Sequence, residues 1–472
     1  MARLMPTSIV NSIRTQKFAI LLALVTAVLY WFFAYELERS DFIRLITLFA
    51  GLFILTYQLI KMFGWNFWLL AGMGVVFRLI FLPAIPNLSQ DFYRFLWDGR
   101  ALALGMNPYL FTPEQYLSET GLFSFIPIAQ ARELYAGMGE LNGSHYSNYP
   151  PLNQLCFAIA ALISGKSILG SAIVLRLLII LADIGILYFG RKLLKALQLP
   201  EKQIFWYFLN PFIIIEMTGN LHFEGVMLFF VVWSLYLLHK GKWVWAAVLL
   251  GLSVSVKLLP LLFLPLFFRY AFQKEGIFNL QRLSRVVLFY VLTLLTVVIT
   301  FLPFLSGEFA DNFAATIGLW FQKFEFNASI YYIIRWIGFQ TIGWNIIASV
   351  GKILPLVVIG FLLLLSFFRK NTETKPLITA LLFGVSFYFL LSTTVHPWYV
   401  ATPLILSVFT KYRFAIVWSA FVMLSYSAYG AEGFSENLWL VALEYVVVAG
   451  FLLWELFLKK SRQNSLQPIE NG

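Results

Sequence analysis

The chain has 472 residues, of which 60% are hydrophobic and only 12% carry a charge, and its mean hydropathy is +0.80. This composition excludes a soluble globular protein and predicts an integral membrane protein. The formal net charge of +11 does not indicate nucleic-acid binding, because the basic residues gather in the connections on one side of the predicted spans. The single cysteine, Cys156, excludes an intrachain disulfide.

Apolar stretches long enough to cross a hydrocarbon core of about 30 Å recur along the whole chain. They predict an all-α polytopic fold of about 12–14 transmembrane helices in one membrane domain, residues 1–472. The first stretch follows Arg14 and Lys17 and is expected to remain as an anchor. The candidate spans are residues 18–35, 42–61, 66–82, 168–190, 203–218, 225–239, 243–256, 258–270, 284–305, 344–368, 377–394, 397–410, 414–430 and 437–458.

Alternate connections collect Lys and Arg, whereas the connections between them hold most of the Asp and Glu. Because Lys and Arg are retained on the cytoplasmic side, both termini are predicted to be cytoplasmic, including a short polar tail at 461–472. The acid-bearing connections are then predicted to lie outside the cytoplasm.

The most informative of these connections reads SQDFYRFLWDGR, residues 89–100, and is predicted to form a polar helix. Asp91 and Asp98 are seven residues apart and share a helix face, with Arg94 beside them. Asp91 falls in the first turn, where the helix dipole favours the ionised form that a general base needs. About 10 Å of helix separate the two carboxylates, so both cannot ligate one metal unless the helix breaks. A solvated helix with a surface ion pair is the alternative interpretation.

Two short apolar regions follow. Residues 151–164 are short for a span and are predicted to form a re-entrant or partly submerged helix, and 243–256 with 258–270 are predicted to form a hairpin. Lys257 lies at the tip of this hairpin in apolar surroundings. A buried ammonium needs a counter-ion, so Lys257 is a candidate ligand for a phosphate, and snorkelling to the interface is the alternative.

The connection TGNLHFEGV, residues 218–226, places His222 and Glu224 between two spans. The two side chains share a face only if the backbone is extended. A zinc site is a weak interpretation, because zinc needs three or four ligands. The two remaining interpretations are hydrogen bonding to a sugar and a structural polar cap on the two helices. His396, in HPWY, lies at the end of a later span and is a further candidate, although a lone interfacial histidine is more often structural.

The stretch FEFNASIYYIIRWIG, residues 324–338, carries Asn327, Tyr331 and Arg335 among bulky apolar residues. Aromatic rings with amide and hydroxyl donors suit sugar binding, and an arginine can hold a phosphate bidentately. An interfacial aromatic belt would have a similar composition. Arg176 and Asp183, inside one span, are predicted to be structural.

Together, SQDFYRFLWDGRALALGMNPY, NYPPLNQ, LNPFIIIEMTGNLHFEGV, SVKLLPLLFLP, FEFNASIYY and HPWY resemble the GT-C superfamily of polytopic glycosyltransferases. The resemblance runs from about Pro83 to Tyr399. It is strongest to bacterial polyprenyl-phosphate-mannose-dependent mannosyltransferases and more distant to the first mannosyltransferase of GPI-anchor synthesis. It implies an inverting hexosyltransferase with a large extracytoplasmic catalytic loop, residues 83–150, in the bacterial inner membrane.

The resemblance also implies roles for residues. The essential acid of the loop falls on Asp91 as general base, and Lys257 with Arg335 would steady the leaving lipid phosphate. Many relatives carry two adjacent acids where this chain has Gln90 before Asp91, so a divalent metal, Mg²⁺ or Mn²⁺, at Asp91 is left open. The remaining predicted substrate-binding residues are Arg94, Asp98, His222, Glu224, Asn327, Tyr331 and His396. The expected partners are a polyprenyl-phosphate-sugar donor, a glycan or glycolipid acceptor of the cell envelope, and the bilayer.

Two other functions are weighed against transfer. A lipid or polysaccharide transporter or flippase would place ionisable residues near the bilayer midplane and within repeated halves, whereas here the acids gather at the ends of the spans and no repeat is visible. A glycan polymerase or ligase that uses another lipid-linked substrate is the third candidate.

Overall fold

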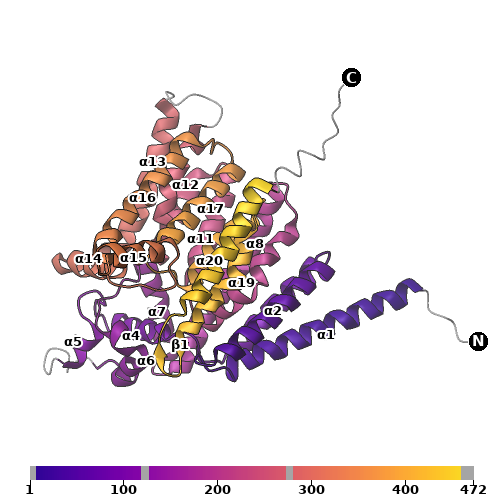
Figure 1. The fold of residues 1–472 in the computed structure, drawn as a ribbon, viewed down its shortest axis with the longest axis horizontal. Coiled ribbons are helices and arrows are strands. Elements are labelled where there is room, and N and C mark those ends of the chain that lie inside the picture. Colours follow the sequence, from indigo (N-terminus) through magenta and orange to yellow (C-terminus); the bar gives the residue numbers. More distant parts are fainter. Residues whose placement is uncertain (1–6, 119–126, 273–279, 459–472) are drawn as a thin grey trace, which may run out of the picture.

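The computed structural model describes residues 7–118, 127–272 and 280–458 (Figure 1). The predicted tail at 461–472 lies outside the described residues. The α-helices are α1 (Thr7–Tyr35), α2 (Phe42–Phe63), α3 (Phe67–Ile80), α4 (Asp91–Ala103), α5 (Pro113–Ser118), α6 (Ala131–Gly143), α7 (Pro151–Ser164), α8 (Ile168–Ala196), α9 (Phe205–Phe208), α10 (Pro211–Ile213), α11 (Glu224–His239), α12 (Trp243–Val256), α13 (Leu280–Phe301), α14 (Gly307–Gln322), α15 (Ile330–Thr341), α16 (Ile347–Phe368), α17 (Thr374–Leu391), α18 (Ala401–Val408), α19 (Phe414–Phe421) and α20 (Leu438–Leu453). The shorter helical segments and the strands are η1 (Glu201–Ile204), η2 (Ile214–Gly219), η3 (Leu259–Phe267), η4 (Arg269–Phe272), η5 (Leu302–Phe304), η6 (Pro397–Val400), η7 (Val422–Ala428), η8 (Trp454–Leu458), β1 (Tyr429–Gly430) and β2 (Gly433–Phe434).

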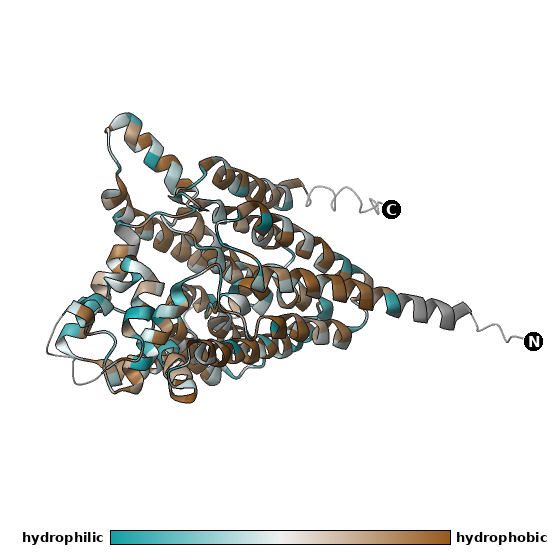
Figure 2. Cartoon of the chain, turned by 90° about the horizontal axis from the view of Figure 1, so that it is seen from below, coloured by the Kyte–Doolittle hydropathy of each residue, from teal (hydrophilic) through white to brown (hydrophobic). Residues whose placement is uncertain are grey.

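The predicted all-α membrane fold is confirmed. Seven described helices are long and apolar enough to cross a membrane, and they become eight if the bent pair Pro211–Gly219 and Glu224–His239 forms one span. Five further apolar helices have only 10–17 residues. The predicted total of about 12–14 spans is reached only if these shorter helices cross as well. Figure 2 shows hydrophobic residues along most of the bundle and hydrophilic residues gathered over α4–α6.

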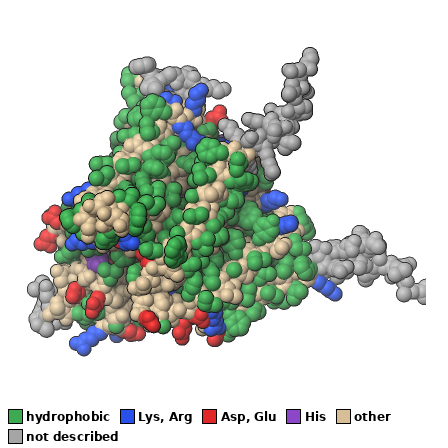
Figure 3. Space-filling view, viewed as in Figure 1, with side chains coloured by type: hydrophobic (Ala, Val, Ile, Leu, Met, Phe, Trp, Pro, Cys, Tyr) green, Lys and Arg blue, Asp and Glu red, His purple; other side chains and the backbone are tan. Residues whose placement is uncertain are grey.

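The two ends of the bundle differ in charge. Asp and Glu side chains lie mainly along the lower edge of the molecule, over α4–α6 and the β1–β2 hairpin, whereas Lys and Arg also gather at the upper end, where α13 begins (Figure 3). We call the lower side the α4 end and the upper side the opposite end. Both lie outside the long apolar faces of the helices, as expected for groups that need water or headgroups around them.

One predicted span is wrong as a single helix. Residues 203–218 form η1, α9, α10 and η2 in succession, and the axis then bends by 116° before α11. The break begins at Asn210-Pro211, where the proline has no N–H to give and the side chain of Asn210 caps the N–H of Phe212 at 3.0 Å. Residues 259–267 likewise form the 3₁₀ segment η3, with Pro265 inside it.

Arg176 in α8 satisfies carbonyl oxygens at the bend. Its side chain is completely buried and donates to the oxygens of Thr218 (2.7 Å) and Gly219 (3.0 Å), and to those of Leu82 and Ala84 (both 2.8 Å). The guanidinium thereby joins the end of η2 to the segment that leads into α4. The prediction that this buried charge is structural is confirmed by these contacts.

A buried ion pair fixes α8 against α3. Arg78 Nε lies 2.8 Å from Asp183 Oδ2, and neither side chain is exposed. Arg78 also donates to the oxygens of Gly74 and Phe208, so three of its hydrogen bonds are made inside the bundle. Asp183 is therefore structural, as predicted.

The region predicted as an extracytoplasmic loop, 83–150, contains three helices, α4–α6, in its described parts, 83–118 and 127–150. Helix α7 packs against α4 and α8. Two helices, α14 and α15, were not predicted, because they have only 16 and 12 residues and carry polar side chains among the apolar ones, so neither indicates a span. Both lie at the left of Figure 1, across the direction of the long helices. The division of the chain into a single membrane domain stays a prediction.

Candidate active site

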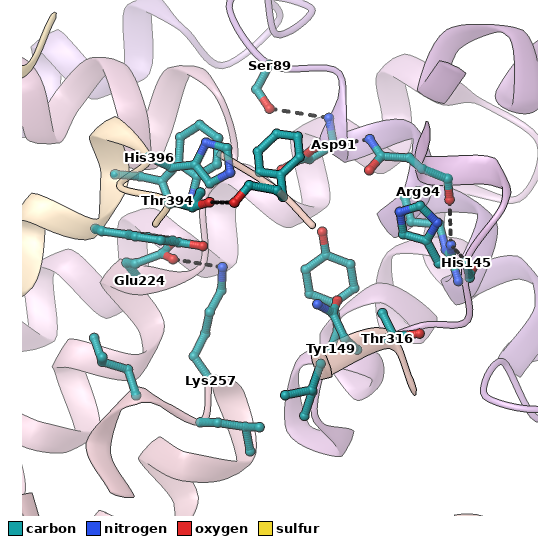
Figure 4. Close-up of a pocket in the computed structure, with 18 of the residues that line it drawn as sticks. Ser89, Asp91, Arg94, His145, Tyr149, Glu224, Lys257, Thr316, Thr394 and His396 are labelled. Atoms are coloured by element: carbon teal, nitrogen blue, oxygen red, sulfur yellow. Dashed lines mark hydrogen bonds and ion pairs between the residues drawn. The ribbon is translucent and has the colours of Figure 1, made fainter. Parts of the chain in front are cut away.

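A cavity of about 650 Å³ lies at the α4 end, between segments that are far apart in the sequence (Figure 4). Its walls come from the α1–α2 connection, from α4, from the loop before α7, from the start of α11, from the end of α12 and from the segment before η6. Five of the ten predicted site residues line it: Asp91, Arg94, Glu224, Lys257 and His396. The other five predicted residues are not in its wall.

Asp91 is the first residue of α4, at the positive end of the helix dipole. Its N–H donates to Ser89 Oγ at 3.3 Å, and its carboxylate accepts a hydrogen bond from Asn142 Nδ2 at 3.3 Å. Burial raises the pKa of Asp91, and the positive charges of Lys257 and Arg39 act in the opposite direction. A carboxylate of raised pKa in a cavity is suited to accept a proton.

Arg94 and Asp98 hold the loop that forms one wall. Arg94 Nε lies 2.7 Å from Asp98 Oδ1, and Arg94 also donates to the backbone oxygen of Asn142 at 2.7 Å. Asp98 is completely buried and accepts hydrogen bonds from Ser147 Oγ (2.5 Å) and Gln154 Nε2 (3.0 Å). The structure therefore places Asp98 behind the wall, where it connects α4, the loop and α7. Arg94 reaches the cavity, so it alone of the two lies within reach of a bound molecule.

Lys257 and Glu224 form an ion pair on the opposite wall. Lys257 Nζ lies 2.7 Å from Glu224 Oε1, and the Nζ lies 5.8 Å from the ring centre of Tyr149 (Figure 4). Lys257 has extended backbone where α12 ends, so its side chain leaves the helix direction and enters the cavity. Its side chain is 20% exposed and that of Glu224 only 3%. The lysine charge is thus paired yet still open to a ligand.

An aromatic stack joins two of the predicted histidines. The ring centres of His222 and Trp398 lie 3.7 Å apart. The ring of His396 stacks on Trp398 as well, with ring centres 4.5 Å apart and an angle of 5° between the two ring planes. His222 is buried behind the cavity, with Nε2 3.6 Å from Glu216 Oε2. Burial and the nearby positive charges of Lys257 and Arg39 lower the pKa of His396 to about 3. At neutral pH His396 is therefore uncharged and can offer a hydrogen bond without adding charge.

Asn327, Tyr331 and Arg335 lie outside the cavity wall, in contact with other acids. Asn327 is completely buried and donates from Nδ2 to Glu444 at 3.2 Å, while Arg335 and the Tyr331 hydroxyl both bind Glu325. The predicted contacts of these three residues with sugar or phosphate stay a prediction, and the proposal below does not depend on them.

Arg39, which the sequence analysis missed, lines the cavity from the α1–α2 connection. Its guanidinium carbon lies 3.2 Å from the ring centre of Tyr429 in β1, and its Nε has no hydrogen-bond partner in the part of the chain that the structure describes. The available signal was that Arg39 is the one basic residue in the acidic stretch 36–41. A stacked arginine with donors to spare is suited to bind an anionic group.

The donor set does not favour a metal. Among the described residues, no group of three or more His, Cys, Asp or Glu side chains is close enough to hold an ion. In the wall, the carboxylate of Glu224 is already paired with Lys257, and Asp91 offers one carboxylate. Mg²⁺ or Mn²⁺ held here would therefore depend on Asp91 together with waters and the phosphate of a bound donor.

The sequence was compared with known proteins. Residues 38–273, half of the chain, match the family model described as Alpha-(1->6)-mannopyranosyltransferase, N-terminal domain. The chain belongs to this family. It is similar to Alpha-(1->6)-mannopyranosyltransferase A of Mycobacterium tuberculosis, with 21% identity over 351 residues, 70% of this chain and 63% of that protein. It is also similar to the protein of the same name from Corynebacterium glutamicum, with 23% identity over 426 residues, 81% of this chain and 80% of that protein.

The comparisons and the apolar helices confirm the expected class, a polytopic membrane protein of the family described as Alpha-(1->6)-mannopyranosyltransferase. The matched region contains Arg39, Asp91, Arg94, Glu224 and Lys257, so most of the cavity wall lies in the part of the chain that defines the family. The chain spans less than two thirds of the length of the mycobacterial relative.

The Arg94–Asp98 pair generates a stability prediction. Asp98→Ala leaves a buried guanidinium without its carboxylate, which typically costs about 3–5 kcal/mol, so the apparent melting temperature of the purified protein should fall markedly. The control is Glu201→Ala, which breaks the partly exposed pair with Arg191 and should cost only about 0–1 kcal/mol. Equal melting temperatures for the two variants would contradict the role given to Asp98.

Proposed function

We propose that this chain is a membrane mannosyltransferase that moves mannose from a polyprenyl-phosphate donor to a hydroxyl of a glycan or glycolipid acceptor. The observation that carries the proposal is that Asp91, Lys257 and Arg39 line one cavity. A carboxylate and two cations are the groups that glycosyl transfer from a phosphate requires, one to accept a proton and the others to stabilise an anion. The names of both relatives support the sugar.

In the proposed reaction Asp91 acts as general base. It takes the proton of the acceptor hydroxyl as that oxygen forms a bond to the anomeric carbon of mannose. Asn142 donates to the Asp91 carboxylate and so fixes which oxygen faces the acceptor. Arg94 and Asp98 position Asn142 through its backbone oxygen, which makes them positioning residues.

Lys257 and Arg39 bind the phosphate of the donor. As the bond between the anomeric carbon and the phosphate oxygen breaks, its electron pair passes to the phosphate, whose charge grows. Arg39 has no carboxylate partner among the described residues, and Lys257 shares its charge with Glu224. The lipid phosphate needs no added proton to leave at neutral pH, so a second acid is not required. The attack is from the face opposite the leaving group, with inversion.

We place the reaction at the outer face of a bacterial inner membrane. The support is the charge distribution: acids lie at the α4 end, and Lys and Arg are numerous in the connections of the opposite end, which the positive-inside rule assigns to the cytoplasm. A donor carried on a lipid is available at that face, whereas a soluble nucleotide sugar is not.

A flippase is the rival function, because the 116° bend before Glu224 resembles the discontinuous helices of transporters. Family membership favours transfer over transport. Product formation decides between them, since a flippase moves its lipid without changing it.

A donor panel tests the proposed reaction. Purified protein with polyprenyl-phosphate mannose and a mannan-type acceptor should form an extended glycan. GDP-mannose should give none, because the proposed donor carries its mannose on a lipid phosphate. Asp91→Asn should lower the turnover at least about a hundredfold, as expected when a general base is lost. Product analysis by mass spectrometry and linkage analysis is the measurement.

The matched control is Asp311→Asn in α14, an exposed aspartate outside the cavity wall, which should transfer at the wild-type rate. Asp91→Asn transferring as fast as Asp311→Asn would remove Asp91 from the mechanism. Product from GDP-mannose alone would contradict the lipid donor.

The raised pKa of Asp91 predicts an acid limb in the pH–rate profile. Only the ionised carboxylate accepts a proton, so the rate should fall as the pH drops through a value above the ordinary pKa of 3.8. Arg39→Gln removes a positive charge that lowers this pKa, so the limb should move to higher pH. The profile of kcat/KM for the donor against pH is the measurement, because it reports the pKa of the enzyme before the donor phosphate binds.

Arg132→Gln serves as control, since Arg132 is an exposed residue of α6 outside the cavity wall and should leave the limb where it is in the wild type. An acid limb that stays in place or moves to lower pH in Arg39→Gln would show that Arg39 does not act on the base.

A further inference from the structure

A second cavity, of about 190 Å³, lies at the opposite end of the bundle. It is formed where α11 ends, where α12 and α13 begin, and where η3 passes into η4. Its lining includes Arg282, Arg285, Trp243, Tyr270 and Tyr290. None of these residues takes part in the candidate active site.

This cavity is far from the first one. The apolar helix Leu280–Phe304 joins the two regions, and its 25 residues rise by about 37 Å. At its far end the ring of Phe304 packs on Tyr109, whose hydroxyl donates to the backbone oxygen of Tyr149 in the wall of the active-site cavity. The second cavity is therefore a separate site, and a molecule bound there cannot touch Asp91.

The mouth of the second cavity is basic. Arg282 and Arg285 are three residues apart in the first turns of α13 and lie on one face of the helix, near its positive end. Arg285 is exposed and makes no ion pair among the described residues. Lys240 and Lys242 flank Gly241, another lining residue, in the turn between α11 and α12. An anion is the ligand that such a mouth attracts.

The interior of the cavity is aromatic. Phe267 and Phe289 pack with ring centres 5.1 Å apart, and Tyr290 lies beside Phe289. The wall is kept in place by Thr374, whose hydroxyl binds His239 Nδ1 at 2.9 Å and the Tyr270 hydroxyl at 3.2 Å. A basic mouth above an apolar interior fits an amphiphile whose head is anionic.

The position of α13 shows where that amphiphile would come from. Only 17% of the apolar stretch in Leu280–Phe304 is buried inside the protein, so this helix presents most of its surface to lipid. Leu283 and Val287 are exposed beside the arginines, at 41% and 50%. The cavity lies at the end of this span, which is the level of the lipid headgroups.

We propose that the second cavity binds the phosphate headgroup of an anionic membrane lipid, with Arg282 and Arg285 as its ligands and the aromatic interior beside its glycerol and the start of its acyl chains. The lysines of the adjacent turn add to the attraction. The bound lipid would fasten the start of α13 to α11 and α12 at the headgroup level.

The test uses the purified full-length protein and native mass spectrometry with short-chain phosphatidylglycerol. Phosphatidylglycerol should bind more tightly than phosphatidylcholine of the same chain length. The variants Arg282→Gln and Arg285→Gln, singly and combined, should weaken the binding of phosphatidylglycerol by about fivefold for each arginine removed. Arg285→Lys, which keeps the charge, should retain most of the binding. Lys370→Gln, an exposed basic residue outside the cavity lining, is the matched control and should bind as the wild type does.

Inorganic phosphate as competitor separates a lipid from a free anion. Millimolar phosphate should fail to displace phosphatidylglycerol, because it lacks the glycerol and acyl parts that contact the aromatic interior. Displacement by phosphate would overturn a lipid site in favour of a free-phosphate site. Equal binding of both lipids by the wild type would also overturn the proposal, and this result needs no variant to fold.

Discussion

The buried guanidinium of Arg176 holds together the two segments on which the active-site cavity depends. An apolar helix that breaks inside a bundle leaves carbonyl oxygens without partners, and such groups are costly in a medium without water. Arg176 donates to two oxygens at the end of η2 and to two in the segment before α4. Glu224 follows the first segment and Asp91 follows the second. Arg176 thereby joins the two segments, together with Asn220, whose Oδ1 accepts a hydrogen bond from the N–H of Leu88 at 3.1 Å.

The two cations that line the active-site cavity differ in how their charges are paired. Lys257 enters the cavity where α12 ends and shares its charge with Glu224, whereas Arg39 stacks on Tyr429 and has no carboxylate partner among the described residues. The two cations lie near Asp91 closely enough to lower a pKa that burial raises. An anion bound between them would neutralise this influence, so binding of a phosphate would raise the affinity of Asp91 for a proton. The order of donor and acceptor binding is thus coupled to the strength of the base.

The fold class was predicted from the sequence, and half of the ten predicted site residues line the cavity. Asp91, Lys257 and Glu224 were found because charged residues next to long apolar stretches are rare and therefore informative. Arg39 was missed because it stands among acids in a connection that looked like a solvated turn, and its stacking on Tyr429 joins residues 390 positions apart. Asp98 was placed in the binding set because it shares a helix face with Asp91, but its partners Ser147 and Gln154 come from a later loop and helix. Such long-range contacts have no local signal.

The span 203–218 shows the same limit for secondary structure. Its composition is largely apolar, so hydropathy indicated one helix. Asn210-Pro211 nevertheless imposes a break, which the surrounding bundle makes tolerable. Breaks of this kind bring the ends of helices, and the polar residues that cap them, into one place.

If Asp91 is the base of a transferase at the outer face of the membrane, it must be accessible from outside the cytoplasm. Cys156 is the one native cysteine, so Asp91→Cys in a Cys156→Ser background gives a single thiol for a membrane-impermeant maleimide. Lys242→Cys, at the opposite end, is the reference from the other side. An outer-face active site predicts labelling at position 91 in intact cells, and labelling at position 242 only in inverted vesicles. Labelling at position 91 only in inverted vesicles would contradict it.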